Sequence, residues 1–260
     1  MSKPEPAFSL ESISFAITGR VLLHPLTLDL PAAGVVGLIG HNGSGKSTLM
    51  KILARQHEAT TGQVRFMGRP LADWGNREFA RELAYLPQQL PPAAGLRVRE
   101  LVAVGRYPWH GALGRFGRAD RNRVEAAMQR TGVTSFANRL VDTLSGGERQ
   151  RVWLAMLVAQ QARCLLLDEP IVALDISHQL EVLRLVRRLA QDGASVLLVL
   201  HDINMAARFC DRIIALRGGQ LIACGGPEKV FRPARLKQIF DVDMDVITHP
   251  ATGRLITFPL

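Results

Sequence analysis

The chain has 260 residues, of which 47% are hydrophobic and 21% are charged, a balance typical of a folded protein with a substantial buried core. This composition excludes a disordered chain and a small disulfide-stapled scaffold. The longest uninterrupted apolar stretch, from Val152 to Ala159, is too short to span a bilayer, and no apolar segment of a signal peptide follows Met1. We therefore expect a chain that stays in the cytoplasm.

A formal net charge of +9 favours anionic partners such as nucleotide phosphates, an anionic membrane face or nucleic acid. The excess is concentrated between Arg97 and Arg130, where eight arginines stand against three carboxylates. No aromatic platform accompanies these arginines, so a solvated helical face or a protein-docking surface is favoured over a nucleic-acid groove. The three cysteines, Cys164, Cys210 and Cys224, are widely spaced, which predicts reduced thiols rather than disulfides or a zinc site.

The first third of the chain is predicted to consist mainly of strands. A short apolar run at 35–39 stops at a glycine-rich loop. Leu49, Met50 and Leu53 then recur at helical spacing, which predicts a helix after the loop. The other strands are expected within 7–30, on both sides of a turn at 18–20, and at 64–67 and 83–86.

Pro87, Pro91 and Pro92 mark a change of pattern, and helices are expected from roughly residue 90 to 160. Asp120 is expected to cap one of these helices, and Ser145 to begin another. Strands are expected again at 165–167 and 195–200, with a helix at 182–189 between them and a hairpin at 213–224 around two glycines. This order predicts an α/β core interrupted by a helical insert.

The segment from Gly40 to Ser47, GHNGSGKS, fits the pattern G-x-x-x-x-G-K-[ST] between a predicted strand and a predicted helix. Glycines are needed here because backbone amides must approach phosphate oxygens closely, in conformations that a Cβ would block. Lys46 would bring a positive charge to the β- and γ-phosphates, Ser47 would ligate Mg²⁺, and the helix N-terminus would add partial positive charge. The segment, called the P-loop below, therefore predicts a nucleotide site.

Two carboxylates, Asp168 and Glu169, follow the apolar strand predicted at 165–167. Because neighbouring side chains of a strand point in different directions, Asp168 can hold the Mg²⁺ shell while Glu169 accepts a proton from water. Strands often end in acidic residues, so the pair alone is about equally consistent with a structural role. The P-loop in the same chain favours the catalytic interpretation.

The segment from Leu144 to Gln150, LSGGERQ, opens a predicted helix and is called the signature segment below. Ser145 and Glu148 fit a capping box, which explains these two residues structurally. Capping does not explain Gly146 and Gly147, which lower helix propensity by about 1 kcal/mol each relative to alanine. Two glycines in a first turn expose backbone amides, so they predict a second anion site.

The P-loop, the signature segment and the strand that ends in Asp168-Glu169-Pro170 together resemble the ATP-binding subunits of ABC transporters, over nearly the whole chain. The resemblance implies an α/β fold: a P-loop (RecA-like) nucleotide-binding core with an antiparallel β subdomain and an inserted helical subdomain. It implies one nucleotide-binding domain over 1–260, with the core and β subdomain in 1–88 and 164–260 and the helical subdomain in 89–163. In this family two subunits face head to tail, and each ATP lies between one P-loop and the other subunit's signature segment.

The same resemblance assigns roles to single residues. Glu169 matches the residue that polarises the attacking water, His201 the switch histidine at the γ-phosphate, and Gln88 the glutamine that contacts Mg²⁺ or the water. Ser47, Gln88 and Asp168 would hold Mg²⁺. Asp175, in Ala173-Leu174-Asp175, would cross the dimer interface. The residues expected to bind ATP are Gly40, Asn42, Gly43, Ser44, Gly45, Lys46, Ser47, Thr48, Ser145, Gly146, Gly147 and Asp175.

The sequence departs from the family pattern at two places. Ile171 and Val172 follow Asp-Glu-Pro where threonine and a small polar residue are common, and we expect slower hydrolysis as a result. Ile17 stands where many members place an aromatic residue that stacks on adenine, so base binding is expected to rest on apolar contact.

A single P-loop without a membrane helix resembles the separate ATPase subunit of an importer. The segment from Val98 to Phe116 is similar to ATPases of iron-siderophore and cobalamin importers. Its run from Gly105 to Phe116, with the segment HDINMAA from His201, is similar to those of ferric hydroxamate importers, and the resemblance implies that this stretch docks beneath a permease, near anionic lipid head groups. The resemblance implies an ATP hydrolase that uses ATP and Mg²⁺ as a homodimer, peripheral on the cytoplasmic face of the inner membrane. Its implied partners are a transmembrane permease and, through it, a periplasmic siderophore-binding protein; nucleic acid is not among them.

Two alternatives stay open. The same machine could import a catecholate siderophore, haem or cobalamin, because an ATPase subunit never touches the cargo. A soluble P-loop ATPase acting on nucleic acid is supported only by the net charge, and strongly salt-dependent binding to DNA or RNA would favour it.

Overall fold

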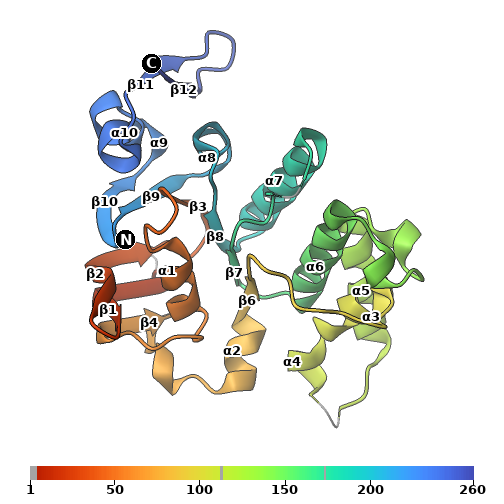
Figure 1. Cartoon of the computed structure of the whole chain (residues 1–260). Coiled ribbons are helices and arrows are strands. Elements are labelled where there is room, and N and C mark those ends of the chain that lie inside the picture. Colours follow the sequence, from red (N-terminus) through yellow and green to blue (C-terminus); the bar gives the residue numbers. More distant parts are fainter. Residues whose placement is uncertain (1–4, 112–113, 173) are drawn as a thin grey trace. The chain divides into compact units, whose positions relative to one another are not determined.

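The computed structural model describes residues 5–111, 114–172 and 174–260 (Figure 1), so Ala112, Leu113 and Ala173 of the motifs above lie outside the described residues. The chain divides into two compact units. The first consists of Met1–Asp73 and Ser195–Leu260, and the second of Trp74–Ala194. The subdomain boundaries implied by the resemblance, after residues 88 and 163, stay a prediction.

One sheet of the first unit is antiparallel and has the strand order β2-β1-β4-β5. The predicted turn is confirmed: Thr18 and Gly19, with φ of 39° and 81°, join the first two strands. Phe8 and Phe66 pair across the sheet and pack their rings 4.7 Å apart in the core. The strands are β1 (Phe8–Ile17), β2 (Arg20–Leu30), β4 (Thr61–Phe66) and β5 (Arg69–Pro70).

The other large set of strands in the first unit has the order β10-β9-β3-β8. β3 pairs in parallel with both β8 and β9, and its side chains are almost all buried, as expected for a parallel strand with both faces covered. The predicted hairpin is confirmed, with Gly218 and Gly219 in its turn. The strands are β3 (Gly34–Ile39), β8 (Ser195–Val199), β9 (Arg212–Arg217) and β10 (Gln220–Gly225).

Along the chain, each helix of the first unit comes after one of its strands, and the last two strands form a small hairpin (Figure 1). Asn204 holds this hairpin: its Nδ2 donates to the Thr257 carbonyl oxygen at 3.0 Å, and its Oδ1 accepts from the Thr257 amide at 2.8 Å. These elements are α1 (Lys46–Leu53), α8 (Ile203–Phe209), α9 (Pro227–Val230), α10 (Pro233–Phe240), β11 (Met244–Thr248) and β12 (Leu255–Pro259), with a 3-10 turn at Leu71–Asp73.

The second unit combines two parallel strands, β6 (Leu83–Leu86) and β7 (Cys164–Leu167), with a group of helices. The largely buried helix α6 packs against α3 and α5 (Figure 1). The helices are α2 (Asn76–Glu82), α3 (Val98–Val104), α4 (Tyr107–His110), α5 (Arg118–Arg130), α6 (Gly146–Gln160) and α7 (Ile176–Gln191), with 3-10 turns at Thr134–Phe136 and Val141–Thr143. In the described parts of the chain, every helix is too short or too polar to cross a membrane.

The expectation for Asp120 needs a correction. Helix α5 begins at Arg118 and not after Asp120, which lies inside the first turn. Its carboxylate nevertheless accepts a hydrogen bond from the Gly117 amide at 3.2 Å, so it satisfies a helix-start amide from within the helix.

Candidate functional site

The P-loop connects β3 to α1 and has the glycine-dependent backbone that its motif predicts. Gly40, Gly43 and Gly45 have φ of 145°, 76° and 101°, a region that favours glycine. At Gly40 a Cβ would lie 2.1 Å from the Leu216 carbonyl oxygen and 2.7 Å from Ser44 Oγ. The loop therefore cannot hold this path with a larger residue at position 40, and its tight turn has the form of a phosphate cradle.

Lys46 is the buried charge of this loop, with 6% of its surface exposed. Its Nζ donates to the carbonyl oxygens of Gly40 at 2.8 Å and His41 at 3.0 Å. The Ser44 hydroxyl is fully buried and has no hydrogen-bond partner among the described residues. A buried ammonium and an unsatisfied hydroxyl in one loop suit an anionic group that offers several oxygens.

The other P-loop residues predicted to bind ATP lie on the same short path. Asn42 and Gly43 are exposed, and Ser47 and Thr48 are half-buried in the first turn of α1. His201 belongs to the same unit and follows β8. Because β3 and β8 pair in parallel, with Leu38 opposite Val199, the P-loop and His201 leave the sheet at the same edge. The topology brings these two predicted features together.

In the second unit, Gln88, Asp168 and Glu169 likewise follow the carboxyl ends of paired parallel strands, with Leu86 opposite Leu167. Gln88 Nε2 donates to Glu169 Oε2 at 2.8 Å. Glu169 has φ of 54°, the left-handed region that is uncommon for a residue with a side chain and often found at functional sites.

Asp168 is 2% exposed, and its amide donates to the Leu86 carbonyl oxygen at 2.9 Å. Burial, and then the Asp168 charge, raises the pKa of the Tyr85 hydroxyl to about 12. The geometry thus separates the two carboxylates as expected: Asp168 is buried at the end of its strand, and Glu169 is more accessible beside Gln88.

The capping box of the signature segment is confirmed. Ser145 Oγ accepts from the Glu148 amide at 3.3 Å, and Glu148 Oε2 accepts from the Ser145 amide at 2.8 Å. The hydrogen bond from the Ser145 amide, then the Ser145 side chain and to a smaller extent the charges of Arg139 and Arg151, lower the pKa of Glu148. Gly146 has open space where a Cβ would be, so the glycine is free to face a ligand.

Asp175 lies beside the signature segment within the second unit. Both border one cavity of about 440 Å³, which is lined by Ser145, Gly147, Glu148, Arg151, Leu174, Asp175 and His178. Asp175 is the N-cap of α7: its carboxylate accepts from the His178 amide at 3.0 Å, from His178 Nδ1 at 2.9 Å and from Ser177 Oγ at 2.9 Å. The hydrogen bonds from His178 and Ser177 lower the pKa of Asp175 to about 2.

His178 is a residue that the sequence analysis missed. It orients the Asp175 carboxylate through two of the three hydrogen bonds above. A side chain with a ring nitrogen three residues after a capping aspartate is the signal that could have revealed it.

The residues that depart from the family pattern differ in exposure. Ile171 is buried, whereas Val172 is 62% exposed, so only the latter can meet a partner directly. In the first unit Ile17 is about half exposed, and Phe15 stacks on His57 with 5.0 Å between ring centroids. The expected effects on hydrolysis and adenine binding stay predictions.

Arg106, one of the arginines of the basic stretch, is not a surface charge. It is fully buried, pairs with Asp120 at 3.0 Å, and donates to the Ala159 carbonyl oxygen at 2.8 Å. Trp109 stacks against its guanidinium, 4.9 Å from the ring centroid, and donates through Nε1 to the Gln160 carbonyl oxygen at 2.8 Å. These two residues tie α4 to α6, and the expected docking role of the stretch from Gly105 to Phe116 stays a prediction.

A glycine cradle with a buried lysine, on a parallel α/β sheet, defines a P-loop nucleotide-binding protein. Comparison with known proteins gives the family. The ABC transporter family matches residues 23–172, more than half of the chain. The chain belongs to the ABC transporter family, and its fold and motifs are those of the family's ATP-hydrolysing subunit.

Particular relatives are similar over nearly the full length. The iron(3+)-hydroxamate import ATP-binding protein FhuC of Bacillus subtilis is 39% identical, over 95% of this chain and 93% of its own. The hemin import ATP-binding protein HmuV of Streptomyces coelicolor is 43% identical, over 98% of this chain and 93% of its own. The ATP-binding cassette MJ0796, solved as a dimer in a post-hydrolysis state with ADP and Pi, superposes with a TM-score of 0.75. It is 27% identical, over 85% of this chain and 98% of its own.

Proposed function

We propose that this chain is the ATP-hydrolysing subunit of an importer that takes up iron(III)-hydroxamate siderophores across the inner membrane. The observation that carries the proposal is the full-length similarity to an iron(3+)-hydroxamate import ATP-binding protein, at 39% identity. The P-loop and the signature segment supply the two phosphate-binding elements that such a subunit needs.

A second cargo is haem, and a specific observation favours it. The relative named for hemin import shares 43% of its residues with this chain, slightly more than the hydroxamate relative. Since the cargo does not contact this subunit, identity alone ranks the two cargoes only weakly, and transport must decide between them.

The first unit would hold the triphosphate. Lys46 would exchange its bonds to the Gly40 and His41 carbonyl oxygens for phosphate oxygens, and the Ser44 hydroxyl would gain the partner it lacks within the described chain. His201, at the same sheet edge, would contact the γ-phosphate. Positive charge and amides fixed in place before the reaction are the main catalytic contribution in phosphoryl transfer.

The second unit would supply the groups that act on water. Glu169 would accept the proton of the attacking water, and Gln88, already bonded to Glu169, would orient it. Ser47, Gln88 and Asp168 offer hydroxyl, amide and carboxylate oxygens, the donor set that Mg²⁺ prefers. When bound, Mg²⁺ would neutralise charge on the β- and γ-phosphates.

The signature segment would act on the ATP of a second copy of the chain. Ser145 and the amides of Gly146 and Gly147 would contact the γ-phosphate held by the other P-loop, and Asp175 would cross the interface. ATP would close this homodimer, and hydrolysis would reopen it. The closure would move a permease on whose cytoplasmic face the chain is a peripheral subunit, and a periplasmic siderophore-binding protein would deliver the cargo.

Uptake by cells that lack this chain tests the proposal. Labelled ferric hydroxamate, ferric catecholate, haem and cobalamin are supplied separately, before and after complementation with the wild type or Glu169→Gln. We expect only hydroxamate uptake to fail and only the wild type to restore it. Loss of haem uptake alone would replace the cargo assignment and keep the ATPase role, whereas uptake restored by Glu169→Gln would contradict that role.

A further inference from the structure

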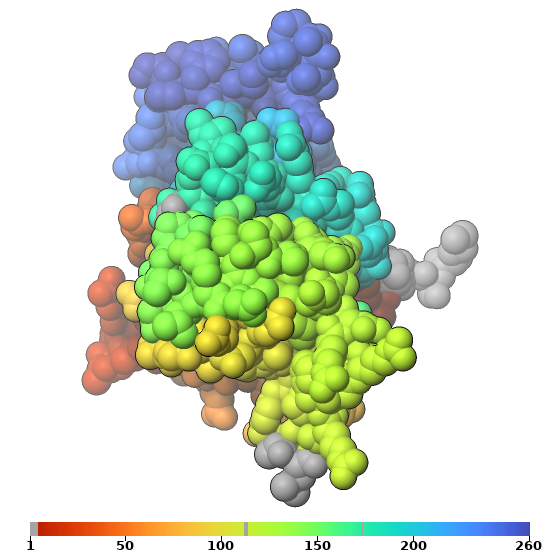
Figure 2. Space-filling view, turned by 90° about the vertical axis from the view of Figure 1, so that its right-hand side faces the viewer, coloured from red at the N-terminus to blue at the C-terminus, as the bar shows by residue number. Residues whose placement is uncertain are grey.

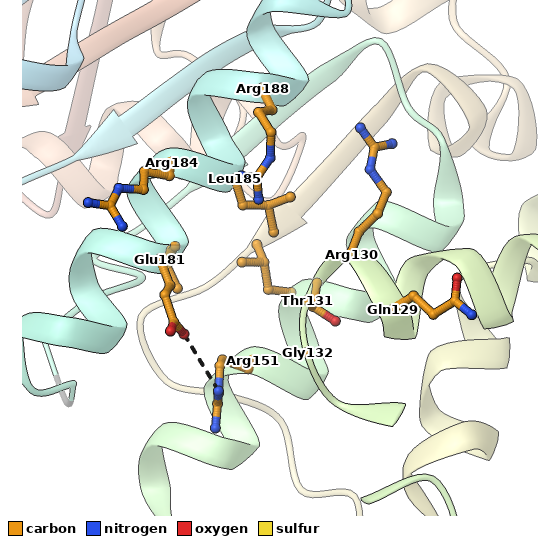
Figure 3. A pocket seen from close by; sticks show the side chains of 11 residues that line it. Gln129, Arg130, Thr131, Gly132, Arg151, Glu181, Arg184, Leu185 and Arg188 are labelled. Atoms are coloured by element: carbon orange, nitrogen blue, oxygen red, sulfur yellow. Dashed lines mark ion pairs between the residues drawn. The ribbon is translucent and has the colours of Figure 1, made fainter. Parts of the chain in front are cut away.

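The second unit contains a basic cavity of about 380 Å³ that the proposed reaction does not use (Figure 3). It lies between the C-terminal end of α5, the middle of α6 and the outer face of α7. Four arginines and one glutamate line it, which gives the lining a net charge of +3. The lining residues are Gln129, Arg130, Thr131, Gly132, Arg151, Leu154, Glu181, Val182, Arg184, Leu185 and Arg188.

The four arginines of this cavity have only two carboxylate partners among the described residues. Arg151 pairs with Glu181 at 3.7 Å, the contact drawn in Figure 3, and Arg130 pairs with Asp192 at 2.6 Å. Both carboxylates are more than half exposed, so water weakens these pairs. Among the residues that the structure describes, Arg184 and Arg188 form no ion pair.

Arg151 is the most enclosed of the four. Its side chain is 15% exposed, its guanidinium lies 5.9 Å from the Phe136 ring centroid, and its Nε is buried without a hydrogen-bond partner within the described chain. A buried guanidinium N–H without an acceptor is unfavourable, and an anionic oxygen would satisfy it.

The volume of the cavity and the positions of its arginines indicate the size and charge of the ligand that it can bind. Figure 3 shows Arg130, Arg151 and Arg188 reaching the cavity from three different helices. In Figure 2 the green surface of α5 and α6 adjoins the teal surface of α7, so the lining elements reach solvent on this face. The volume falls within the range of small-molecule sites, and guanidinium groups bind phosphate through paired hydrogen bonds. We propose that this cavity binds a small soluble anion that carries at least two phosphate groups, at a site separate from the P-loop.

The site has a physical route to the signature segment. Arg151 also lines the neighbouring cavity that contains Ser145, Gly147 and Asp175. An anion that draws Arg151 away from that cavity removes a positive charge near Glu148, the partner of Ser145 in the capping box. Binding at the arginines therefore changes the electrostatics of the second phosphate-binding element, although the binding itself does not depend on the proposed transport function.

Equilibrium dialysis of the full chain with labelled inorganic pyrophosphate tests the proposal. The P-loop can also bind this probe, so the comparison needs the double variant Arg130→Gln/Arg188→Gln, the variant Lys46→Ala, and the two combined. Arg118→Gln/Arg121→Gln is the matched control, because it removes the same two charges from exposed positions on α5 outside the cavity. Melting curves verify that every variant folds, and Arg188→Lys retains the charge without the guanidinium fork.

We expect the wild type to bind pyrophosphate at both sites. The arginine double variant keeps only the P-loop site and Lys46→Ala keeps only the cavity, with the lost site weakened at least about tenfold. Arg118→Gln/Arg121→Gln behaves as the wild type, and Arg188→Lys binds with intermediate affinity. Unchanged binding in the arginine double variant would overturn the proposal. So would binding through these arginines to phosphatidylglycerol vesicles without binding to pyrophosphate, since the ligand would then be a lipid headgroup. Loss of pyrophosphate binding at the P-loop in Lys46→Ala tests the proposed function, and it is independent of the result for the cavity.

Discussion

The P-loop before α1 and the signature segment before α6 are both glycine-rich helix starts, but they differ in every local detail. Before α1 the chain passes through three glycines with positive φ, and Gly45 caps the helix without a side chain. Before α6, Gly146 and Gly147 lie in ordinary helical conformation, and a complete capping box closes the first turn.

The difference shows that glycine serves two physical purposes here. In the P-loop it permits a backbone path that no other residue can follow, as the carbonyl contact at Gly40 shows. In the signature segment the φ values are ordinary, and a Cβ would meet open space at Gly146 but would lie 3.0 Å from Leu174 at Gly147. The proposed purpose of these glycines is to leave amides uncovered for a ligand. The first start is built around its own buried lysine, whereas the second offers an open surface.

The largest expected effect is at Lys46. Replacing it with alanine removes the buried charge that faces the loop's carbonyl oxygens, so ATP turnover should fall on the order of a hundredfold or more. Lys51→Ala, on the same helix, is the matched control and should retain turnover. Steady-state hydrolysis measures both, and equal loss in the two variants would contradict the role of Lys46.

Alanine at Gly40 and at Gly146 should separate the two purposes of glycine. Gly40→Ala should lower the free energy of unfolding by about 3 kcal/mol or more, because the new Cβ meets a carbonyl oxygen and the φ is unfavourable. Gly146→Ala should leave it unchanged or raise it by up to about 1 kcal/mol, through better helix propensity. Urea unfolding measures both, and similar destabilisation would break the comparison.

Ser145→Ala should lower the free energy of unfolding by about 1 kcal/mol, since the Glu148 amide loses its acceptor. If Ser145 also contacts the γ-phosphate, hydrolysis should fall further than this loss of stability explains. Ser145→Asp keeps a good helix cap but adds a negative charge, so it should fold well and hydrolyse poorly. Full activity in a stable Ser145→Asp chain would leave the residue only its capping role.

The smallest expected effect concerns pH. The pKa of Asp175 is about 2 in the folded chain, below its ordinary value, so its stabilising contribution is complete above about pH 4 and is lost as the pH falls toward 2. His178→Ala removes the imidazole, leaves the backbone bond, and should move the pKa of Asp175 upward. NMR titration of the carboxyl carbon checks this, and an unchanged pKa would assign the shift to the His178 amide and the Ser177 hydroxyl.

The elements that local patterns encode were predicted well. The strand before the P-loop, the two glycine turns and the capping box at Ser145 depend on residues a few positions apart, and the structure confirms all of them. Helix α5 was placed too late because Asp120 was assigned a position outside the helix, whereas its carboxylate acts from inside the first turn.

Features set by distant contacts were not predictable in the same way. The burial of Arg106 depends on carbonyl oxygens at the end of α6, and the C-terminal hairpin depends on Asn204, 53 residues before Thr257. The side-chain bond between Gln88 and Glu169 needed the parallel pairing of β6 and β7. The family resemblance predicts the roles of these site residues. The pairing of parallel strands explains why they lie close together within each unit.

The central claim is that one chain's P-loop and another's signature segment hold the same ATP, and Glu169→Gln tests it most directly. The substituted amide can still accept the hydrogen bond from Gln88, but it cannot take a proton from water. Light scattering should show that this variant is a stable dimer in saturating ATP and a monomer without nucleotide. ATP hydrolysis by the variant should be abolished. A variant that remains monomeric in saturating ATP would contradict the claim.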